Sequence, residues 1–99
     1  MNKSPKKSAK PKLNFEMLST EWSHTDGEGY VRIIPIDSYK TGFVAMAHIG
    51  PLAEQLQYYP EITLCGDKVI IKIDDADQQT ALQLARQIDD VFHVDDSEQ

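Results

Sequence analysis

The spacing of the apolar residues changes at Pro60, from a helical pattern before it to a strand pattern after it, and this limits the folds open to the chain. Before it, apolar residues between positions 39 and 57 recur at spacings of three and four, which is typical of a helix with one buried face. After it, residues 61–65 and 68–74 form two short runs rich in β-branched side chains, separated by Gly66 and Asp67. A two-residue loop that starts with glycine fits a type II′ hairpin turn. Because proline interrupts a helix, the sequence predicts a helix that ends before Pro60 and an antiparallel hairpin after it.

The predicted helix over residues 39–57 has a start signal and one internal interruption. Asp37 and Ser38 precede it, and both residue types are favoured at a helix N-cap. Gly50 and Pro51 interrupt the pattern, and we expect a kink rather than a break because the apolar stripe keeps its phase across them. The residues expected on the buried face are Phe43, Met46, Ala47, Ile49, Leu52, Ala53 and Leu56.

A second hairpin is predicted before this helix. Residues 21–25 resemble a strand, and residues 26–29 supply a turn whose two glycines can take positive φ. Residues 30–36 follow as a β-branched strand, with Pro35 at its end or on an edge because proline cannot donate to a ladder. Part of the segment over residues 15–22 can form a short helix.

The last predicted element is a helix that begins after Asp75 or Asp77 and carries a stripe of Ala81, Leu84, Ala85, Ile88, Val91 and Phe92. The order strand, strand, helix, strand, strand, helix predicts an α+β fold, a four-stranded antiparallel sheet (ββαββα) with two helices packed on one face. Val69, Ile71 and Ile73 are expected on one face, and Arg32 and Lys72 on the uncovered face. Edge strands in so small a domain favour self-association, so we expect a dimer.

The charge pattern divides the chain into a basic leader and an acidic body. Residues 1–12 contain five lysines and no acidic residue, whereas the rest carries five basic and sixteen acidic side chains. We expect a disordered leader over residues 1–12, one domain over residues 13–94 and a frayed acidic tail over residues 95–99. An acidic body disfavours nucleic acid as a partner, because phosphate contacts need clustered Lys and Arg.

Several other classes of function find no support in the sequence. No apolar run approaches the roughly 18 residues of a membrane span, and no apolar segment follows the lysines as in a secretory signal. The single cysteine, Cys65, fits a reducing cytoplasm. His24, His48 and His93 lack metal-ligand spacing, so we interpret them as unrelated surface or boundary residues. We expect no metal, no cofactor and no membrane partner.

From about Trp22 to Phe92 the chain resembles the pterin-4a-carbinolamine dehydratases, also known as 4a-hydroxytetrahydrobiopterin dehydratases. The residues that carry the resemblance are Trp22, the run Leu52-Ala53-Glu54-Gln55-Leu56, Pro60, Lys68 and Val69 eight residues beyond the proline, and the final helix that ends Leu84-Ala85-Arg86-Gln87-Ile88-Asp89. The resemblance implies the same four-stranded fold in a homodimer or tetramer. It also implies a lyase reaction, the loss of water from the carbinolamine carbon of a reduced pterin.

The resemblance further implies a set of site positions, and three of its residues are replaced. The family signature has a glutamate, then His-His-Pro, then a further histidine downstream. Here Glu54 and Pro60 are kept, but the histidine positions hold Tyr58, Tyr59 and Ala76. Imidazole suits both general acid and general base catalysis, whereas tyrosine is a weak base at neutral pH. Because acid–base help is worth roughly 10²–10⁴-fold, we expect a degenerate active site and assign no catalytic residue.

The residues then predicted to bind a ligand or partner are Glu54, Tyr58, Tyr59, Pro60, Glu61, Asp74, Asp75 and Ala76. One hypothesis is a binding or assembly factor, in which the tyrosines and Glu61 contact a pterin ligand or a protein client. The run Tyr59-Pro60-Glu61-Ile62-Thr63 is similar to the degenerate branch of this fold that serves as rubisco assembly factors of α-carboxysomes, although residues 64–68 depart from it. The alternative is an active dehydratase in which Asp74 or Asp75 accepts a proton. A third interpretation is that one of the two tyrosines only packs beneath the sheet.

Overall fold

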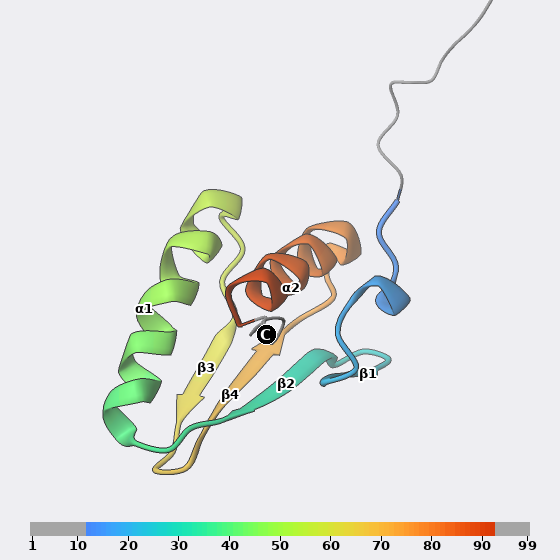
Figure 1. The fold of residues 1–99 in the computed structure, drawn as a ribbon. Helices are drawn as coiled ribbons and strands as arrows, with labels where there is room; N and C mark the ends of the chain where they lie inside the picture. The colour runs from blue at the N-terminus through green and yellow to red at the C-terminus, as the bar shows by residue number, and fades with distance from the viewer. Residues whose placement is uncertain (1–11, 93–99) are drawn as a thin grey trace, which may run out of the picture.

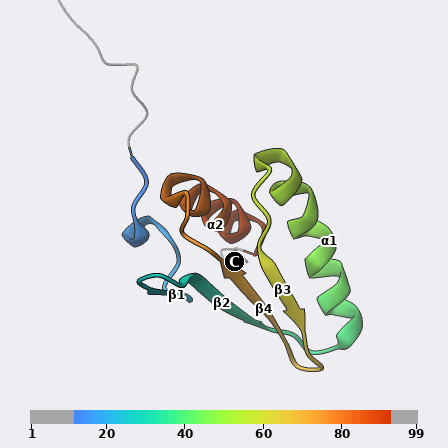
Figure 2. The same cartoon turned by 180° about the vertical axis from the view of Figure 1, so that it is seen from behind.

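The computed structural model describes residues 12–92, which form a four-stranded antiparallel sheet with both helices on one side (Figure 1). The elements are a short 3₁₀ helix η1 (Phe15–Met17), strands β1 (Trp22–Thr25) and β2 (Gly29–Pro35), helix α1 (Tyr39–Leu56), strands β3 (Glu61–Leu64) and β4 (Lys68–Ile73), and helix α2 (Gln78–Phe92). The strand order is β1-β2-β4-β3, so β1 and β3 lie at the two edges (Figure 2). This confirms the α+β prediction. The predicted leader apart from Lys12, the predicted tail and His93 lie outside the described residues.

The two hairpins pair as the turn residues predict, with one exception. Gly27 and Gly29 both have positive φ, as predicted, and Pro35 is the last residue of β2. In the second hairpin, Cys65 N donates to Lys68 O at 2.8 Å, which closes the predicted two-residue loop. However, Gly66 does not have positive φ. The type II′ prediction is therefore wrong, because that turn requires positive φ at its first loop residue.

Helix α1 is continuous through Pro51, and its N-cap is the predicted Ser38, whose Oγ accepts from Thr41 N at 3.1 Å. Its buried face differs in part from the predicted stripe. The residues that are buried are Gly42, Ala45, Ile49 and Ala53, whereas Phe43 is 55% exposed and Ala47 is also exposed. The reason is close packing, since a Cβ at Gly42 would collide with the side chains of Leu64 and Ile36. The first half of the helix therefore presents small residues, Gly42 and Ala45, to the sheet, whereas Ile49 is the large residue that is fully buried farther along.

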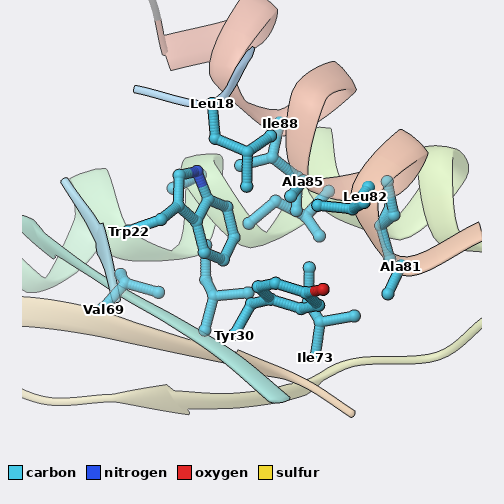
Figure 3. Close-up of a cluster of buried hydrophobic side chains, with 13 residues drawn as sticks. Leu18, Trp22, Tyr30, Val69, Ile73, Ala81, Leu82, Ala85 and Ile88 are labelled. Atoms are coloured by element: carbon cyan, nitrogen blue, oxygen red, sulfur yellow. The ribbon is translucent and has the colours of Figure 1, made fainter. Parts of the chain in front are cut away.

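The core lies between the sheet and α2 (Figure 3). Val69, Ile71 and Ile73 of β4 are fully buried on the helix-covered face, as predicted. Above them lie the buried residues of α2, namely Ala81, Leu82, Leu84, Ala85 and Ile88. The predicted stripe omitted Leu82 and included Val91, which is 40% exposed. Among residues 12–92 no helix is long and apolar enough to cross a bilayer.

The prediction for Arg32 is wrong. It lies opposite Ile71 in the ladder, so both side chains face the helices, and Arg32 is only 9% exposed. Its Nη1 donates to Asp89 Oδ1 of α2 at 2.6 Å. Because a buried charge requires a partner, it is Asp89 that allows an arginine to occupy this face.

Candidate functional site

Tyr58 links the end of α1 to the turn between β4 and α2. Gln57 takes a left-handed conformation with φ of 52°, which ends the helix, and Tyr58 N donates to Ala53 O at 3.1 Å. The Tyr58 hydroxyl donates to Asp74 Oδ1 at 2.6 Å and accepts from Asp77 N at 3.0 Å. Tyr58 is therefore the tyrosine with a packing role, in line with the third interpretation above.

The two partners of this hydrogen bond are held in opposite protonation states. Burial, with the hydrogen bond to Asp74 as the next cause, raises the pKa of Tyr58 above its ordinary value. The same hydrogen bond, together with one from Ala76 N, lowers the pKa of Asp74. At neutral pH the phenol is thus protonated and the carboxylate charged. The Tyr58 phenol is consequently an even weaker acid than a free tyrosine, and less of it is present at neutral pH as the phenolate that could accept a proton.

Tyr59 faces outward, at 61% exposure, into a cavity of about 500 Å³. We refer to this as the Tyr59 cavity, and its lining residues are Glu28, Tyr59, Glu61, Lys72 and Asp74. Glu61 and Lys72 lie opposite each other in the β3–β4 ladder. Because Val69, Ile71 and Ile73 point toward the helices, Lys72 points to the uncovered face. The cavity thus lies at the open face of the sheet, near the start of β3 and the end of β4.

The Tyr59 cavity carries more negative than positive charge, with three carboxylates against one ammonium. The ion pairs of Lys or Arg with Asp or Glu formed within residues 12–92 are Arg32–Asp89 and Lys68–Asp67, and neither involves a lining residue. Its carboxylates can therefore accept hydrogen bonds from a ligand, and the exposed ring of Tyr59 offers a flat surface to a planar or cationic group.

The structure brings together part of the predicted site. Tyr59, Glu61 and Asp74 line one cavity, and Tyr58 and Ala76 contact Asp74 from outside it. The remaining predicted residues do not line it; Glu54 lies exposed in the last turns of α1, Pro60 is half-buried, and Asp75 turns toward β1.

His24 is half-buried, consistent with the boundary interpretation. Its Nε2 lies 3.3 Å from Asp75 Oδ2, and its ring stacks on Tyr30 with centroids 4.5 Å apart. Neither His24 nor Asp75 lines the Tyr59 cavity, although Asp75 follows Asp74 directly in the sequence. His48 lies exposed on α1, consistent with the surface interpretation. In the part of the chain that the structure describes, no group of three or more His, Cys, Asp or Glu residues could hold a metal ion.

Glu28 and Lys72 line the cavity but were not among the predicted site residues. Lys72 could have been found, because a two-residue loop at Gly66 and Asp67 places residue 61 opposite residue 72. Glu28 could not, because its position depends on the β2–β4 register, which pairs Tyr30 with Ile73 and which no local turn determines.

Comparisons with known proteins support the resemblance. The Halobacterium salinarum protein named "Putative pterin-4-alpha-carbinolamine dehydratase" is 29% identical over 79 residues, which cover 76% of this chain and 86% of that protein. The same protein from a second strain of that organism matches equally well. No protein-family model matches the chain.

The structural comparison decides the fold. The crystal structure of a transcriptional coactivator/pterin dehydratase from Brucella melitensis matches with a TM-score of 0.65 and 21% identity, over 77% of this chain and 85% of that one. The chain has a pterin-dehydratase fold. The chain is thus similar in sequence to a protein named as a putative pterin-4-alpha-carbinolamine dehydratase, and it shares its fold with a pterin dehydratase. The loss of catalysis and a role in rubisco assembly are not tested by these matches and stay predictions.

Proposed function

We propose that this pterin-dehydratase-like protein is a binding or assembly factor. Its Tyr59 cavity receives a planar or cationic group rich in N–H donors. The protein does not catalyse dehydration by the family's histidine mechanism. The single observation that carries this proposal is the lining of the cavity, which combines three carboxylates with an exposed tyrosine and, within the described chain, has no imidazole.

The chemistry of the lining supports binding. An ionised carboxylate accepts hydrogen bonds and donates none. The hydrogen bonds that lower the pKa of Asp74 favour this ionised form. A reduced pterin presents several N–H groups on a flat ring, and a basic side chain of a protein client presents N–H groups with a positive charge. Both chemistries match acceptors beside an exposed aromatic ring. A cavity of about 500 Å³ is also in the size range of small-molecule sites.

The same residues give little support to catalysis. Loss of water from a carbinolamine needs a group that donates a proton to the leaving hydroxide and another that takes a proton from the ring nitrogen. Tyr58 is already engaged with Asp74 and Asp77, and its raised pKa makes proton transfer harder. Ala76 has no group that can transfer a proton. The lining retains acceptors for binding but not the imidazoles that would act near neutral pH.

Calorimetric titration with 7,8-dihydrobiopterin tests the binding part for a pterin. We expect saturable binding that Tyr59→Ala and Glu61→Gln each weaken by about tenfold, the size expected for a lost aromatic or charged contact. Tyr39→Ala is the matched control, because Tyr39 is similarly exposed, at 54%, but lies on α1 away from the cavity. If no pterin binds, the same variants are tested in co-purification with candidate clients, rubisco included. Equal effects of Tyr59→Ala and Tyr39→Ala in both assays would contradict the proposal.

The hydrogen bond between His24 and Asp75 favours a second candidate function, an active dehydratase. A carboxylate that orients an imidazole is a common arrangement of acid–base catalysts, and this pair lies beside Asp74 of the cavity. In that case the protein accelerates dehydration of a 4a-hydroxy-tetrahydropterin, and His24→Gln removes most of the acceleration while His48→Gln does not. Without acceleration by the wild-type protein, this candidate is rejected.

A further inference from the structure

A second concave surface lies on the other side of the molecule, between α1, the C-terminal end of α2 and the end of β2. We call it the Arg32 groove; it encloses about 570 Å³. Its walls are mainly apolar and include Ile34, Ile36, Val44, Ala45, Val91 and Phe92. Val44 is 52% exposed and Val91 40% exposed. None of these residues lines the Tyr59 cavity, so the two concave surfaces are separate.

Arg32 is the buried polar residue of the groove, and its hydrogen bonding is incomplete. It is 9% exposed and its Nη1 donates to Asp89 Oδ1 at 2.6 Å, but its buried Nε has no hydrogen-bond partner among residues 12–92. A guanidinium has five N–H donors, and an unsatisfied buried donor is unfavourable. Because Nε is itself buried, an acceptor in the groove would satisfy this donor after a small shift of the Arg32 side chain, which lines the groove.

The pairing with Asp89 leaves part of the hydrogen-bonding capacity of Arg32 unused. The Asp89 carboxylate also accepts from Trp22 Nε1 at 2.7 Å and from Ser19 N at 2.8 Å. Its negative charge is thus shared among three donors, whereas Arg32 donates from one nitrogen to a partner within residues 12–92. A guanidinium binds carboxylates well because its planar donors match two oxygens.

The other charged or titratable residues of the groove do not remove this preference for an anion. Glu21 is exposed, where water and salt screen its charge. His48 is also exposed. Arg32 is the permanent cation of the groove and lies in a desolvated position, where its electrostatic interactions are stronger.

We propose that the Arg32 groove binds a small apolar carboxylate. The hydrocarbon body lies against Val44 and Val91, and the carboxylate accepts hydrogen bonds from Arg32. The volume suits such a ligand, since small-molecule pockets are mostly apolar with a few polar groups that fix orientation. The proposal is independent of the function of the Tyr59 cavity.

Titration of the ¹⁵N-labelled protein with octanoate, followed by NMR, tests this site. We expect saturable shifts at the amides of Val44, Ala45 and Phe92, and binding of 1-octanol that is about tenfold weaker because the alcohol lacks the charge that Arg32 recognises. Equal affinity for octanoate and octanol would overturn the proposal. So would octanoate shifts centred on other residues, or no saturation in the millimolar range.

Two variants and a control distinguish specific recognition of the carboxylate from nonspecific hydrophobic binding. Val44→Trp fills the groove from an exposed position and should abolish octanoate binding. Arg32→Lys keeps the charge but loses the fork of donors, so octanoate binding should weaken about tenfold while octanol binding is unchanged. Tyr59→Ala should alter neither. If Arg32→Lys unfolds, as circular dichroism would show, the Val44→Trp result and the comparison of octanoate with octanol still decide. Sedimentation that shows a dimer dissociated by Val44→Trp would overturn the proposal and assign the groove to a second copy of the chain.

Discussion

Tyr58 and Tyr59 are neighbours in the sequence, yet the structure gives them different roles. The hydroxyl of Tyr58 joins Asp74 and Asp77, whereas Tyr59 is 61% exposed. Tyr58→Phe removes a hydroxyl that both donates and accepts, so we expect a loss of about 1–2 kcal/mol in the free energy of unfolding. Tyr59→Phe should change it by less than about 0.5 kcal/mol. Urea denaturation of both variants measures this, and equal losses would contradict the assigned roles.

The hydrogen bond from Tyr58 also predicts a pH dependence. The pKa of Asp74 is lower in the folded than in the unfolded protein, so its contribution to stability is present above the unfolded pKa and is lost as the pH falls through the folded value. We expect the wild-type protein to lose more stability than Asp74→Asn below about pH 4. Urea unfolding at several acidic pH values provides the comparison. Parallel curves for the two proteins would show that Asp74 contributes nothing.

Residues whose place depends on hydropathy could be predicted from the sequence, and residues whose place depends on a distant partner could not. The alternation in β4 correctly placed Val69 and Lys72 on opposite faces. The same reasoning placed Arg32 on the wrong face, because its partner Asp89 lies 57 residues away in the sequence. The contact between His24 and Asp75 could not be predicted for the same reason, because the two residues are 51 positions apart.

At the scale of the elements, the β1–β2 turn shows how two glycines in the same turn differ. Both have positive φ, but a Cβ at Gly29 would collide with the carbonyl oxygen of Ile73, whereas a Cβ at Gly27 meets open space. We expect Gly27→Ala to cost about 1 kcal/mol from its backbone conformation. Gly29→Ala should cost more than about 2 kcal/mol, because it also forces β2 and β4 apart. Thermal unfolding ranks them, and the reverse order would contradict the β2–β4 register.

The elements themselves could be predicted well, but their faces could not always be. The Ser38 cap, the break at Pro60 and the two hairpins follow from local chemistry. For α1 the pattern correctly placed Ile49 and Ala53 on the buried face but wrongly placed Phe43 there, because the first turns of the helix lie too close to Leu64 and Ile36 for more than a small residue such as Gly42. The spacing of apolar residues indicates which face of a helix is hydrophobic, whereas the distance between helix and sheet limits the side-chain volume at each position of that face.

For the whole molecule, Asp89 joins several segments that lie far apart in the sequence. It accepts hydrogen bonds from Ser19, Trp22 and Arg32, which connects α2 to β2, to β1 and to the segment before β1. Asp89→Ala leaves a buried arginine without its counter-ion, so we expect a loss of about 3–5 kcal/mol. The neighbouring Asp90 is exposed, and Asp90→Ala should cost less than about 0.5 kcal/mol. Similar losses in urea denaturation would contradict the role of the network.

The element order and the two hairpins could be predicted from local signals, but the pairing of β2 with β4 could not. The Brucella structure shows the same fold. The site could be derived only in part. Tyr59, Glu61 and Asp74 follow from the resemblance, whereas Glu28 enters the cavity through a strand register that local patterns leave open. A site lined by β3, by the end of β4 and by the β1–β2 turn depends on long-range pairing to a greater degree than any single element does.

Dehydration of a 4a-hydroxy-tetrahydropterin, followed by stopped-flow absorbance at increasing protein concentration, tests the proposed loss of catalysis most directly. The structure provides carboxylates and tyrosines where imidazoles would be needed, so the predicted rate equals that of buffer alone at every concentration. A rate that rises with protein concentration and falls again in His24→Gln would contradict this account and establish an active dehydratase.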